Sequence, residues 1–451
     1  MSDYIVAIDL GTSHITGIVG KKKMNGKFSI VACKSVETET CIHRGIIYDS
    51  DDTATCIENI LKNLESNLQG AHIDKVYVGV GGQSLHTIDH IESMNIAEGV
   101  AVKEEDIKAL KEQCEKYKPN LKDVLSIAHV VYMINGQKHT KPVDKMGKLL
   151  EAHYKIVVGR SSIRQRITKS IERIPGKQLA GIIVSPLALA DAVLSPRDKE
   201  LGCALVDFGA GVTSVSIFKD GDLQHLIVIP LGGNLITRDV SSLQLTMEEA
   251  EKLKIEHGCA ILQNEEENKV IQIEIEGAER EIKLNDLNMI IEGRAREIVE
   301  NVNACISGVI DPKKLGTGIV LAGRGADLTD LSELLKDKCE VKKVRVSPIQ
   351  DGWVEDADEM LGNPLYMMAI SLMLKGTESC VSSAITKDKG DKKVITPDIT
   401  GATGETKTVN TQEPVVTPTP KKSIFRNRVI KIFDAKEVKK TPFVTELFNE
   451  E

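Results

Sequence analysis

The stretch YIVAIDLGTSHITGIV, residues 4–19, decides which fold the sequence predicts. An apolar, β-rich run enters a turn at Asp9-Leu-Gly-Thr-Ser13 and leaves as a second such run, which is the pattern of a β-hairpin. Residues 203–218, CALVDFGAGVTSVSIF, repeat the pattern, and aligning Asp9 with Asp207 also aligns Gly11 with Gly209. The repeat predicts two related lobes, each with one hairpin.

Both turns have the residue types of a phosphate-binding loop. Glycine lets backbone N–H groups approach phosphate oxygens without a Cβ in the way, and small hydroxyl residues add donors. An aspartate at the end of a strand can hold Mg²⁺ through water, because Mg²⁺ usually keeps several of its waters. Either Asp-x-Gly alone would favour a simple hairpin turn. Two copies at matching positions instead predict two loops that clamp a polyphosphate between the lobes.

A third glycine cluster, GIVLAGRGADL at residues 318–328, strengthens this interpretation. It has the pattern of an apolar strand that runs into a glycine turn and then into a helix starting near Asp327. Such a turn suits the adenine end of a nucleotide, where the backbone must pass close to a flat ring. The sequence has neither a Walker A Gly-Lys-Ser/Thr nor a Gly-x-Gly-x-x-Gly after a strand.

Length and composition fit a large protein of the α/β class. The chain has 451 residues, more than one compact domain usually holds, and its core must be mainly aliphatic because aromatics make up only 3%. Short β-rich runs alternate with helical patterns over residues 1–375, which predicts an α/β fold. The net charge of −8 argues against nucleic-acid binding, since neutralising phosphate needs a basic surface.

The sequence also predicts a cytosolic location. Asp3 and Asp9 interrupt the first apolar stretch, and the longest apolar run, residues 181–194, is too short to span a bilayer. The nine cysteines are scattered without a Cys-x-x-Cys pair, which indicates reduced thiols. His86 and His90 have the spacing of metal ligands on a helix, but their surroundings alternate like a strand, so we interpret them as ordinary histidines.

The C-terminal part of the chain has a different composition. Residues 386–420 contain no aromatic residue and no leucine, so we expect residues 376–422 to be a disordered linker that spans roughly 35–40 Å. Residues 421–440 then hold eight Lys/Arg and two acidic residues, and residues 441–451 hold three acidic ones. An acidic body would be repelled by an anionic bilayer, which a basic tail on a tether can reach.

The basic tail has the pattern of an interfacial amphipathic helix. Ser423 could cap a helix whose apolar residues share one broad side, with basic residues beside and opposite them. One short helix of this kind is a marginal anchor, so stable attachment would need several copies together. Docking of the helix on the protein's own body or on a partner is the alternative. The residues expected to contact a membrane are Ile424, Phe425, Arg426, Arg428, Val429, Lys431, Ile432 and Phe433.

Together these motifs resemble the actin/Hsp70/sugar-kinase superfamily of two-lobed ATP-binding proteins and, within it, the FtsA family of bacterial cell-division proteins. Residues 182–194 and 362–370 resemble the two connecting helices of the superfamily. Residues 230–240 are similar to the FtsA run that follows the second phosphate loop. Residues 84–160 look like the subdomain that FtsA proteins insert in the first lobe.

The resemblance implies a domain organisation and a set of binding residues. It implies a first-lobe core at 1–83 and 161–200, the inserted subdomain at 84–160, a second lobe at 201–375 with an outer subdomain at about 237–315, the linker at 376–422, the amphipathic helix at 423–440 and an acidic tail at 441–451. Asp9 and Asp207 are expected to hold Mg²⁺ through water. The residues expected to bind ATP are Asp9, Gly11, Thr12, Ser13, His14, Asp207, Gly209, Ala210, Gly211, Thr213, Gly232, Gly233, Glu251, Lys254, Gly323, Arg324 and Gly325.

Some positions depart from the superfamily pattern. His14 stands where a lysine often reaches the β- and γ-phosphates, and Arg324 stands where a glycine is usual. Val212 and Ser214 replace hydroxyl and acidic residues of the second loop, and Ser185 replaces an acidic residue before a proline. Nucleotide binding is still expected, because the glycines and both aspartates remain. We expect at most a weak ATPase, since no residue can be named that positions the attacking water.

The function implied by the resemblance is that of a nucleotide-dependent scaffold. It would polymerise, tether FtsZ to anionic lipid on the cytoplasmic face of the cell membrane at the division septum, and help to recruit other divisome proteins. A sugar- or acetate-kinase-like phosphotransferase of the same fold is the alternative, although it would not need a basic tail on a tether. An Hsp70-like chaperone would need a β-rich substrate domain after the two lobes, and none is evident.

Overall fold

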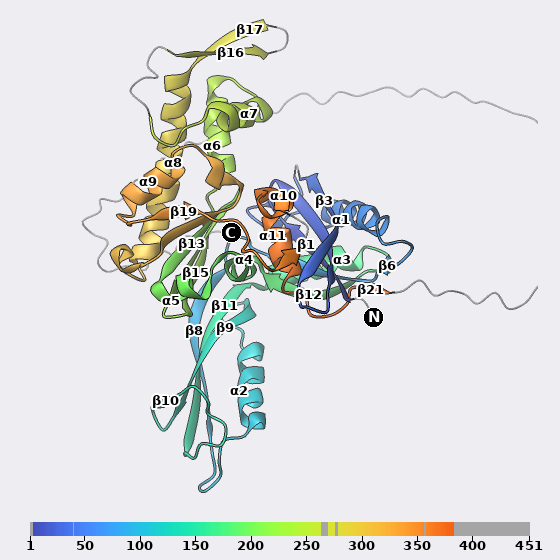
Figure 1. The fold of residues 1–451 in the computed structure, drawn as a ribbon, viewed down its shortest axis with the longest axis vertical. Coiled ribbons are helices and arrows are strands. Elements are labelled where there is room, and N and C mark those ends of the chain that lie inside the picture. The colour runs from blue at the N-terminus through green and yellow to red at the C-terminus, as the bar shows by residue number, and fades with distance from the viewer. Residues whose placement is uncertain (1–2, 39, 263–268, 276–277, 356–357, 383–451) are drawn as a thin grey trace, which may run out of the picture. The chain divides into compact units, whose positions relative to one another are not determined.

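Two large β-sheets organise the chain in the computed structural model, which describes residues 3–38, 40–262, 269–275, 278–355 and 358–382 (Figure 1). The first sheet has the order β12-β7-β1-β2-β3-β20. Its strands are β1 (Asp3–Leu10), β2 (His14–Lys22), β3 (Phe28–Glu37), β7 (Lys75–Val80), β12 (Gln178–Val184) and β20 (Val354–Glu355). The second has the order β10-β9-β11-β8-β15-β14-β13-β18-β19. Its strands are β8 (His86–Asn95), β9 (Lys122–Ile134), β10 (Gln137–His139), β11 (Leu149–Arg160), β13 (Cys203–Phe208), β14 (Thr213–Lys219), β15 (Asp222–Ile229), β18 (Gly318–Ala322) and β19 (Val344–Val346).

Helices and small two-stranded sheets complete the fold, and the α/β class predicted from the sequence is confirmed. The small sheets pair β4 (Ile42–His43) with β5 (Ile46–Ile47), β6 (His72–Ile73) with β21 (Val381–Ser382), and β16 (Val270–Ile275) with β17 (Ala278–Lys283). The helices are α1 (Ser50–Glu65), α2 (Glu104–Lys116), α3 (Ser161–Glu172), α4 (Ser185–Val193), α5 (Pro196–Leu201), α6 (Gly233–Val240), α7 (Met247–His257), α8 (Leu284–Ser307), α9 (Leu331–Lys338), α10 (Asp358–Leu361) and α11 (Pro364–Met373).

The first lobe is built around the hairpin predicted at residues 4–19. Strands β1 and β2 pair antiparallel, with Asp9 opposite Thr16. Helix α1 covers one face of this sheet, since a Cβ at Gly17 would lie 2.3 Å from Cγ2 of Ile60. Helix α11 covers the other face, where a Cβ at Gly20 would lie 2.2 Å from Sδ of Met373. Small residues in β2 therefore let both helices approach the sheet closely.

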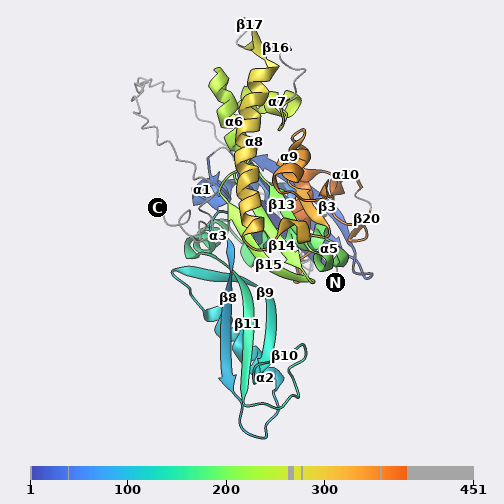
Figure 2. The ribbon, with the colours of Figure 1, turned by 90° about the vertical axis from the view of Figure 1, so that its left-hand side faces the viewer.

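The inserted subdomain consists of strands β8 to β11 and helix α2, which lies against the sheet (Figure 2). Its core is made of residues at alternate positions of β11, such as Leu150, Tyr154 and Ile156, together with Leu110 of α2. The chain leaves the first lobe after β7 and returns to it through α3 and β12. Its sheet, however, continues that of the second lobe, because β8 also pairs with β15. The insertion is thus covalently part of one lobe and hydrogen-bonded to the other.

The second lobe repeats the hairpin of the first lobe. Strands β13 and β14 pair antiparallel, as predicted; Asp207 lies opposite Ser214, and β18 lies parallel to β13. Helix α8 extends from this region to the outer part of the lobe, where α6, α7 and the β16–β17 hairpin lie together (Figure 2). Thr246 caps α7 through a capping box with Glu249, which satisfies backbone N–H groups that would otherwise lack partners.

Helices α4 and α11 pack against each other, and they fall largely on the runs predicted as connecting helices, although Ile182 to Val184 belong to β12. Asp191 of α4 forms ion pairs with both Lys199 of α5 and Lys375, which follows α11. Burial raises the pKa of Asp191, but its hydrogen bonds with the two lysines outweigh burial and bring the pKa below the ordinary 3.8. This cluster links the neighbouring helices α4 and α5 to Lys375, which lies 184 residues away in the sequence.

An Asp191→Asn variant is expected to lose about 1 kcal/mol of unfolding free energy near neutral pH, because the pairs are partly exposed and screened. Since the folded-state pKa is lowered, the carboxylate stabilises the fold above about pH 4, and this contribution is lost as the pH falls further. Urea denaturation at several pH values measures the difference. Asp220→Asn, at an exposed aspartate, is the matched control. Equal losses for both variants would contradict the prediction.

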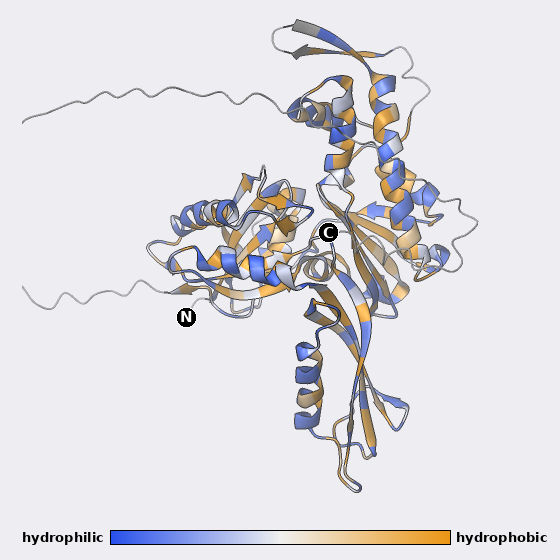
Figure 3. Cartoon of the chain, turned by 180° about the vertical axis from the view of Figure 1, so that it is seen from behind, coloured by the Kyte–Doolittle hydropathy of each residue, from blue (hydrophilic) through white to orange (hydrophobic). Residues whose placement is uncertain are grey.

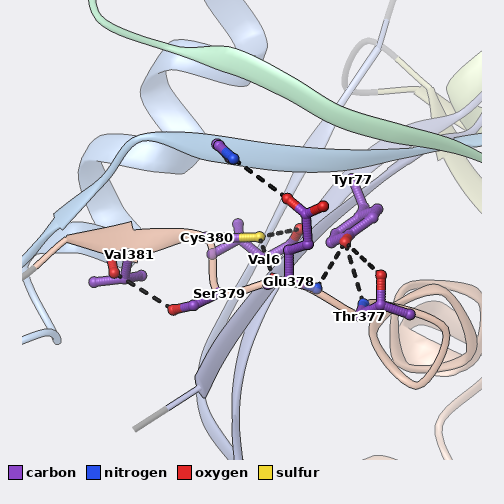
Figure 4. Close-up of polar contacts among 8 residues, drawn as sticks. Val6, Tyr77, Thr377, Glu378, Ser379, Cys380 and Val381 are labelled. Carbon is purple, nitrogen blue, oxygen red and sulfur yellow. Dashed lines mark hydrogen bonds and ion pairs between the residues drawn. The ribbon is translucent and has the colours of Figure 1, made fainter. Parts of the chain in front are cut away.

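Residues 376–382, called the strap below, run across the first lobe after α11 (Figure 4). The Tyr77 hydroxyl accepts hydrogen bonds from the backbone N–H groups of Thr377 (3.1 Å) and Glu378 (2.9 Å). The Cys380 N–H donates to the carbonyl of Tyr4 at 2.7 Å, and β21 pairs with β6. The linker was predicted to begin at residue 376, so the structure corrects that boundary. The strap's backbone groups find partners in the folded body, and residues 383–422 lie outside the described part of the chain.

The free energy of unfolding of a Tyr77→Phe variant is expected to be about 1–3 kcal/mol lower than that of the wild-type chain, because two backbone N–H groups of the strap lose their acceptor. Chemical denaturation measures this loss, and faster backbone amide hydrogen exchange at Thr377 and Glu378 localises it. Tyr4→Phe is the matched control. Normal exchange protection of the strap in Tyr77→Phe would refute the role given to the hydroxyl.

Hydrophobic residues are concentrated in the strands of the two large sheets, as Figure 3 shows, and the core is mainly aliphatic as predicted. All nine cysteines are free thiols, of which Cys33, Cys56 and Cys305 are partly exposed and the others buried. The region around His86 and His90 is strand β8, as its alternation predicted. Within the described ranges, no helix combines the length and apolarity needed to cross a membrane.

Candidate functional site

The two candidate phosphate loops face each other in the structure. Loop 1 joins β1 to β2 and loop 2 joins β13 to β14. A Cβ at Gly211 of loop 2 would lie 2.4 Å from the Thr12 hydroxyl of loop 1, so only glycine permits this approach. The Thr12 hydroxyl also accepts a hydrogen bond from the Gly45 N–H at 3.0 Å, which fixes its orientation. Two segments that lie far apart in the sequence thus meet directly.

An aspartate lies at the entrance of each loop. Burial, and then the negative charge of Asp207, raise the pKa of Asp9 from 3.8 to about 7. Burial alone raises the pKa of Asp207 from 3.8 to about 6. Two carboxylates that are costly to ionise together provide a favourable environment for a cation. Their oxygen donors also suit Mg²⁺, so these residues fit the ion expected from the sequence.

The predicted adenosine turn follows β18 and packs directly against loop 2. Gly323 has φ +85°, and a Cβ there would lie 2.4 Å from Oδ1 of Asp207, so both its backbone conformation and its surroundings require glycine. A 3₁₀ turn over Arg324–Asp327 follows. Helix α9 begins at Leu331 rather than near Asp327, because this 3₁₀ turn and Asp330 intervene. The strand and the glycine turn agree with the prediction.

Glu251 and Lys254, two of the residues expected to bind ATP, meet on α7. The Lys254 Nζ and Glu251 Oε2 atoms are 2.5 Å apart at i,i+3 spacing. Lys254 also donates to the hydroxyl of Thr237 at 2.9 Å, and Thr237 donates to Glu251. Burial lowers the pKa of Lys254, although the charge of Glu251 opposes this. A fixed ammonium and carboxylate beside the loops can recognise polar groups of a nucleoside.

The glycine pair before α6 brings this helix against loop 2. A Cβ at Gly232 would lie 2.6 Å from the carbonyl oxygen of Ala210, and the Gly233 N–H donates to the Gly209 carbonyl at 3.0 Å. The N-terminus of α6 is therefore held against the second loop, whose Gly209 and Ala210 carbonyls accept hydrogen bonds from the first N–H groups of the helix. Both glycines are among the residues expected to bind ATP, and the structure brings them together with loop 2.

Two polar residues of the site were not predicted. Thr237 lies one helical turn after Gly233, so a helix starting at that glycine could have placed its hydroxyl near α7. The Thr38 hydroxyl donates to the Thr12 carbonyl at 2.9 Å, a contact that no local pattern reveals. The predicted membrane-contacting residues, from Ile424 to Phe433, lie outside the described residues.

This arrangement of two lobes with matching hairpins, facing glycine loops and an inserted subdomain defines the class of actin-like α/β proteins. A solved structure titled "PilM-PilN type IV pilus biogenesis complex" supports the fold alone, with a TM-score of 0.55 and 14% sequence identity. The match covers 82% of this chain and 97% of the chain in that structure. Residues 204–371 match the family described as "Cell division protein FtsA", and residues 82–158 match the "SHS2 domain inserted in FTSA".

Full-length relatives carry the same description. "Cell division protein FtsA" of Porphyromonas gingivalis is 31% identical over 400 residues, which cover 87% of this chain and 82% of the relative. The protein of the same description from Bacillus subtilis is 28% identical and covers 82% of this chain and 84% of the relative. The chain belongs to the FtsA family of cell-division proteins.

Proposed function

We propose that the chain binds ATP with Mg²⁺ between its two lobes and, in that state, acts as a scaffold of the division machinery. It polymerises with further copies of itself, binds FtsZ and holds it at anionic lipid on the cytoplasmic face of the cell membrane. The helix at residues 423–440 makes the lipid contact, and the assembly helps to recruit later divisome proteins. The domain boundaries inferred from the sequence, with the strap added to the first lobe, belong to the same proposal.

The observation that carries the nucleotide proposal is the close approach of two matching loops, each with an aspartate at its entrance. In this proposal the backbone N–H groups of Gly11, Thr12 and Gly211 bind phosphate oxygens, while the Gly209 N–H holds the turn of loop 2 through the Val212 carbonyl. Glu251 and Lys254 bind the nucleoside, and Asp9 and Asp207 hold Mg²⁺, which neutralises phosphate charge. Binding that joins both loops favours the closed arrangement of the lobes. The proposal includes at most weak ATPase activity.

Co-sedimentation tests the scaffold role directly. The purified chain is mixed with FtsZ and vesicles containing anionic phosphatidylglycerol, with and without Mg²⁺–ATP. We expect FtsZ to pellet with the vesicles only when the chain is present, and more strongly with ATP. Vesicles of neutral phosphatidylcholine are the lipid control. Failure of FtsZ to pellet, combined with transfer of phosphate from ATP to a sugar or acetate, would replace the scaffold by the phosphotransferase alternative.

A further inference from the structure

Basic groups from three separate elements converge beside the phosphate loops. The Nη1 atom of Arg324, on the 3₁₀ turn after β18, lies 3.2 Å from Nδ1 of His14, the first residue of β2 after loop 1. Burial, and then the positive charge of Arg324, lower the pKa of His14. The charge of Arg324 also lowers the pKa of Lys254 on α7. Burial lowers this pKa more strongly, and Glu251 raises it. Arg324, on the second lobe, therefore contacts the first lobe at the start of β2.

The guanidinium is exposed and has little opposite charge around it. Lys254 is paired with Glu251, and the nearest carboxylate to His14 is the exposed Glu37, at 3.8 Å from Nε2. In the part of the chain that the structure describes, no carboxylate forms an ion pair with Arg324, which instead contacts a histidine whose neutral form is favoured. Arginine presents several donors in a planar fork that matches phosphate oxygens. A polyanion would relieve the repulsion between these basic groups.

We propose that Arg324 is the phosphate-binding cation of this site and that it makes binding selective for nucleotides with two or more phosphates. The proposal rests on the nucleotide binding proposed above. Loop 1 has no lysine at position 14, so its only basic side chain is the histidine that Arg324 contacts. On binding, Arg324 leaves the imidazole and donates to the β-phosphate. The positive charge that a lysine at position 14 would supply thus comes from Arg324, on the turn after β18.

Isothermal titration calorimetry with Mg²⁺ and ATP, ADP or AMP tests this assignment. Arg324→Gln is expected to weaken ADP and ATP binding about 10- to 100-fold and AMP binding less than about threefold. Arg324→Lys, which keeps the charge, is expected to retain binding within about fivefold. Arg197→Gln, at an exposed arginine on α5, is the matched control and leaves all three affinities unchanged. The double variant His14→Lys/Arg324→Gln returns the charge to loop 1 and restores ADP binding.

The outcomes separate this inference from the proposal on which it rests. Equal ADP affinity in the wild-type chain and Arg324→Gln would overturn the role of Arg324 and leave nucleotide binding intact. An equal loss for AMP and ADP would also overturn it, because the side chain would then act on the nucleoside or on the fold. No binding of any nucleotide by the wild-type chain would overturn both.

Discussion

An Asp9→Asn variant is expected to be more stable than the wild-type chain near pH 8 without nucleotide, and to bind Mg²⁺–ATP about 100-fold more weakly. Burial and the charge of Asp207 make ionisation of Asp9 unfavourable, and an amide removes this cost. The expected gain is about 1–2 kcal/mol, since both aspartates keep some access to solvent. The loss of affinity follows because Mg²⁺ loses one of its two anionic partners.

The sign of the pH dependence follows from the raised pKa. A folded-state pKa of about 7, against 3.8 ordinarily, means that the folded chain holds the proton more tightly than the unfolded chain. The wild-type chain therefore loses stability as the pH rises from about 4 to about 7, whereas Asp9→Asn lacks this loss. Thermal melts at several pH values and calorimetry with Mg²⁺–ATP measure both effects. A variant destabilised at every pH would contradict the argument.

Removal of residues 423–451 is expected to abolish binding to anionic vesicles while nucleotide affinity stays unchanged. The removed segment contains five large apolar and three basic residues predicted to contact lipid. Each buried apolar side chain contributes about 1.5–3 kcal/mol before ordering costs, and each basic residue contributes about 1 kcal/mol near the surface. The described fold ends at residue 382, well before the cut. Flotation with the vesicles measures binding.

Two further variants separate the contributions within the tail. Phe425→Ser/Phe433→Ser removes apolar area and is expected to release the chain from vesicles at all salt concentrations. Arg426→Gln/Arg428→Gln leaves the apolar side intact, so its binding is expected to weaken mainly at low salt, where charge attraction is strong. If the truncated chain floats as fully as the intact one, the tail is not the membrane contact.

The hairpins, the turn after β18 and the pairing on α7 were predictable because each depends on a local pattern. Alternating or continuous apolar runs predict strands, and Asp-x-Gly marks the turns between them. The i,i+3 spacing of Glu251 and Lys254 is enough to place both side chains on one face of α7. The internal repeat then indicates that Asp9 and Asp207 occupy equivalent positions. Each of these features depends on residues that lie close together in the sequence.

The features that were missed depend on contacts between distant segments. Arg324 and His14 are separated by 310 positions, and they meet only because the turn after β18 in the second lobe lies beside the start of β2 in the first. The pairing of β8 with β15 likewise joins the insertion to a lobe that it does not follow in the chain. The composition after Gly376 resembles a linker, yet the Tyr77 hydroxyl and the carbonyl of Tyr4 satisfy backbone groups there. No local pattern predicts such partners.

The strap determines where mechanical load enters the molecule. Any tension on residues 383–451 reaches the described fold first at β21, and then passes to the backbone around Cys380 and to the hydrogen bonds made by Tyr77. These contacts all belong to the lobe that carries Asp9. If residues 383–451 hold the chain at a membrane, as proposed above, the first lobe is the one attached to it, and closure on a nucleotide would move the second lobe relative to that membrane.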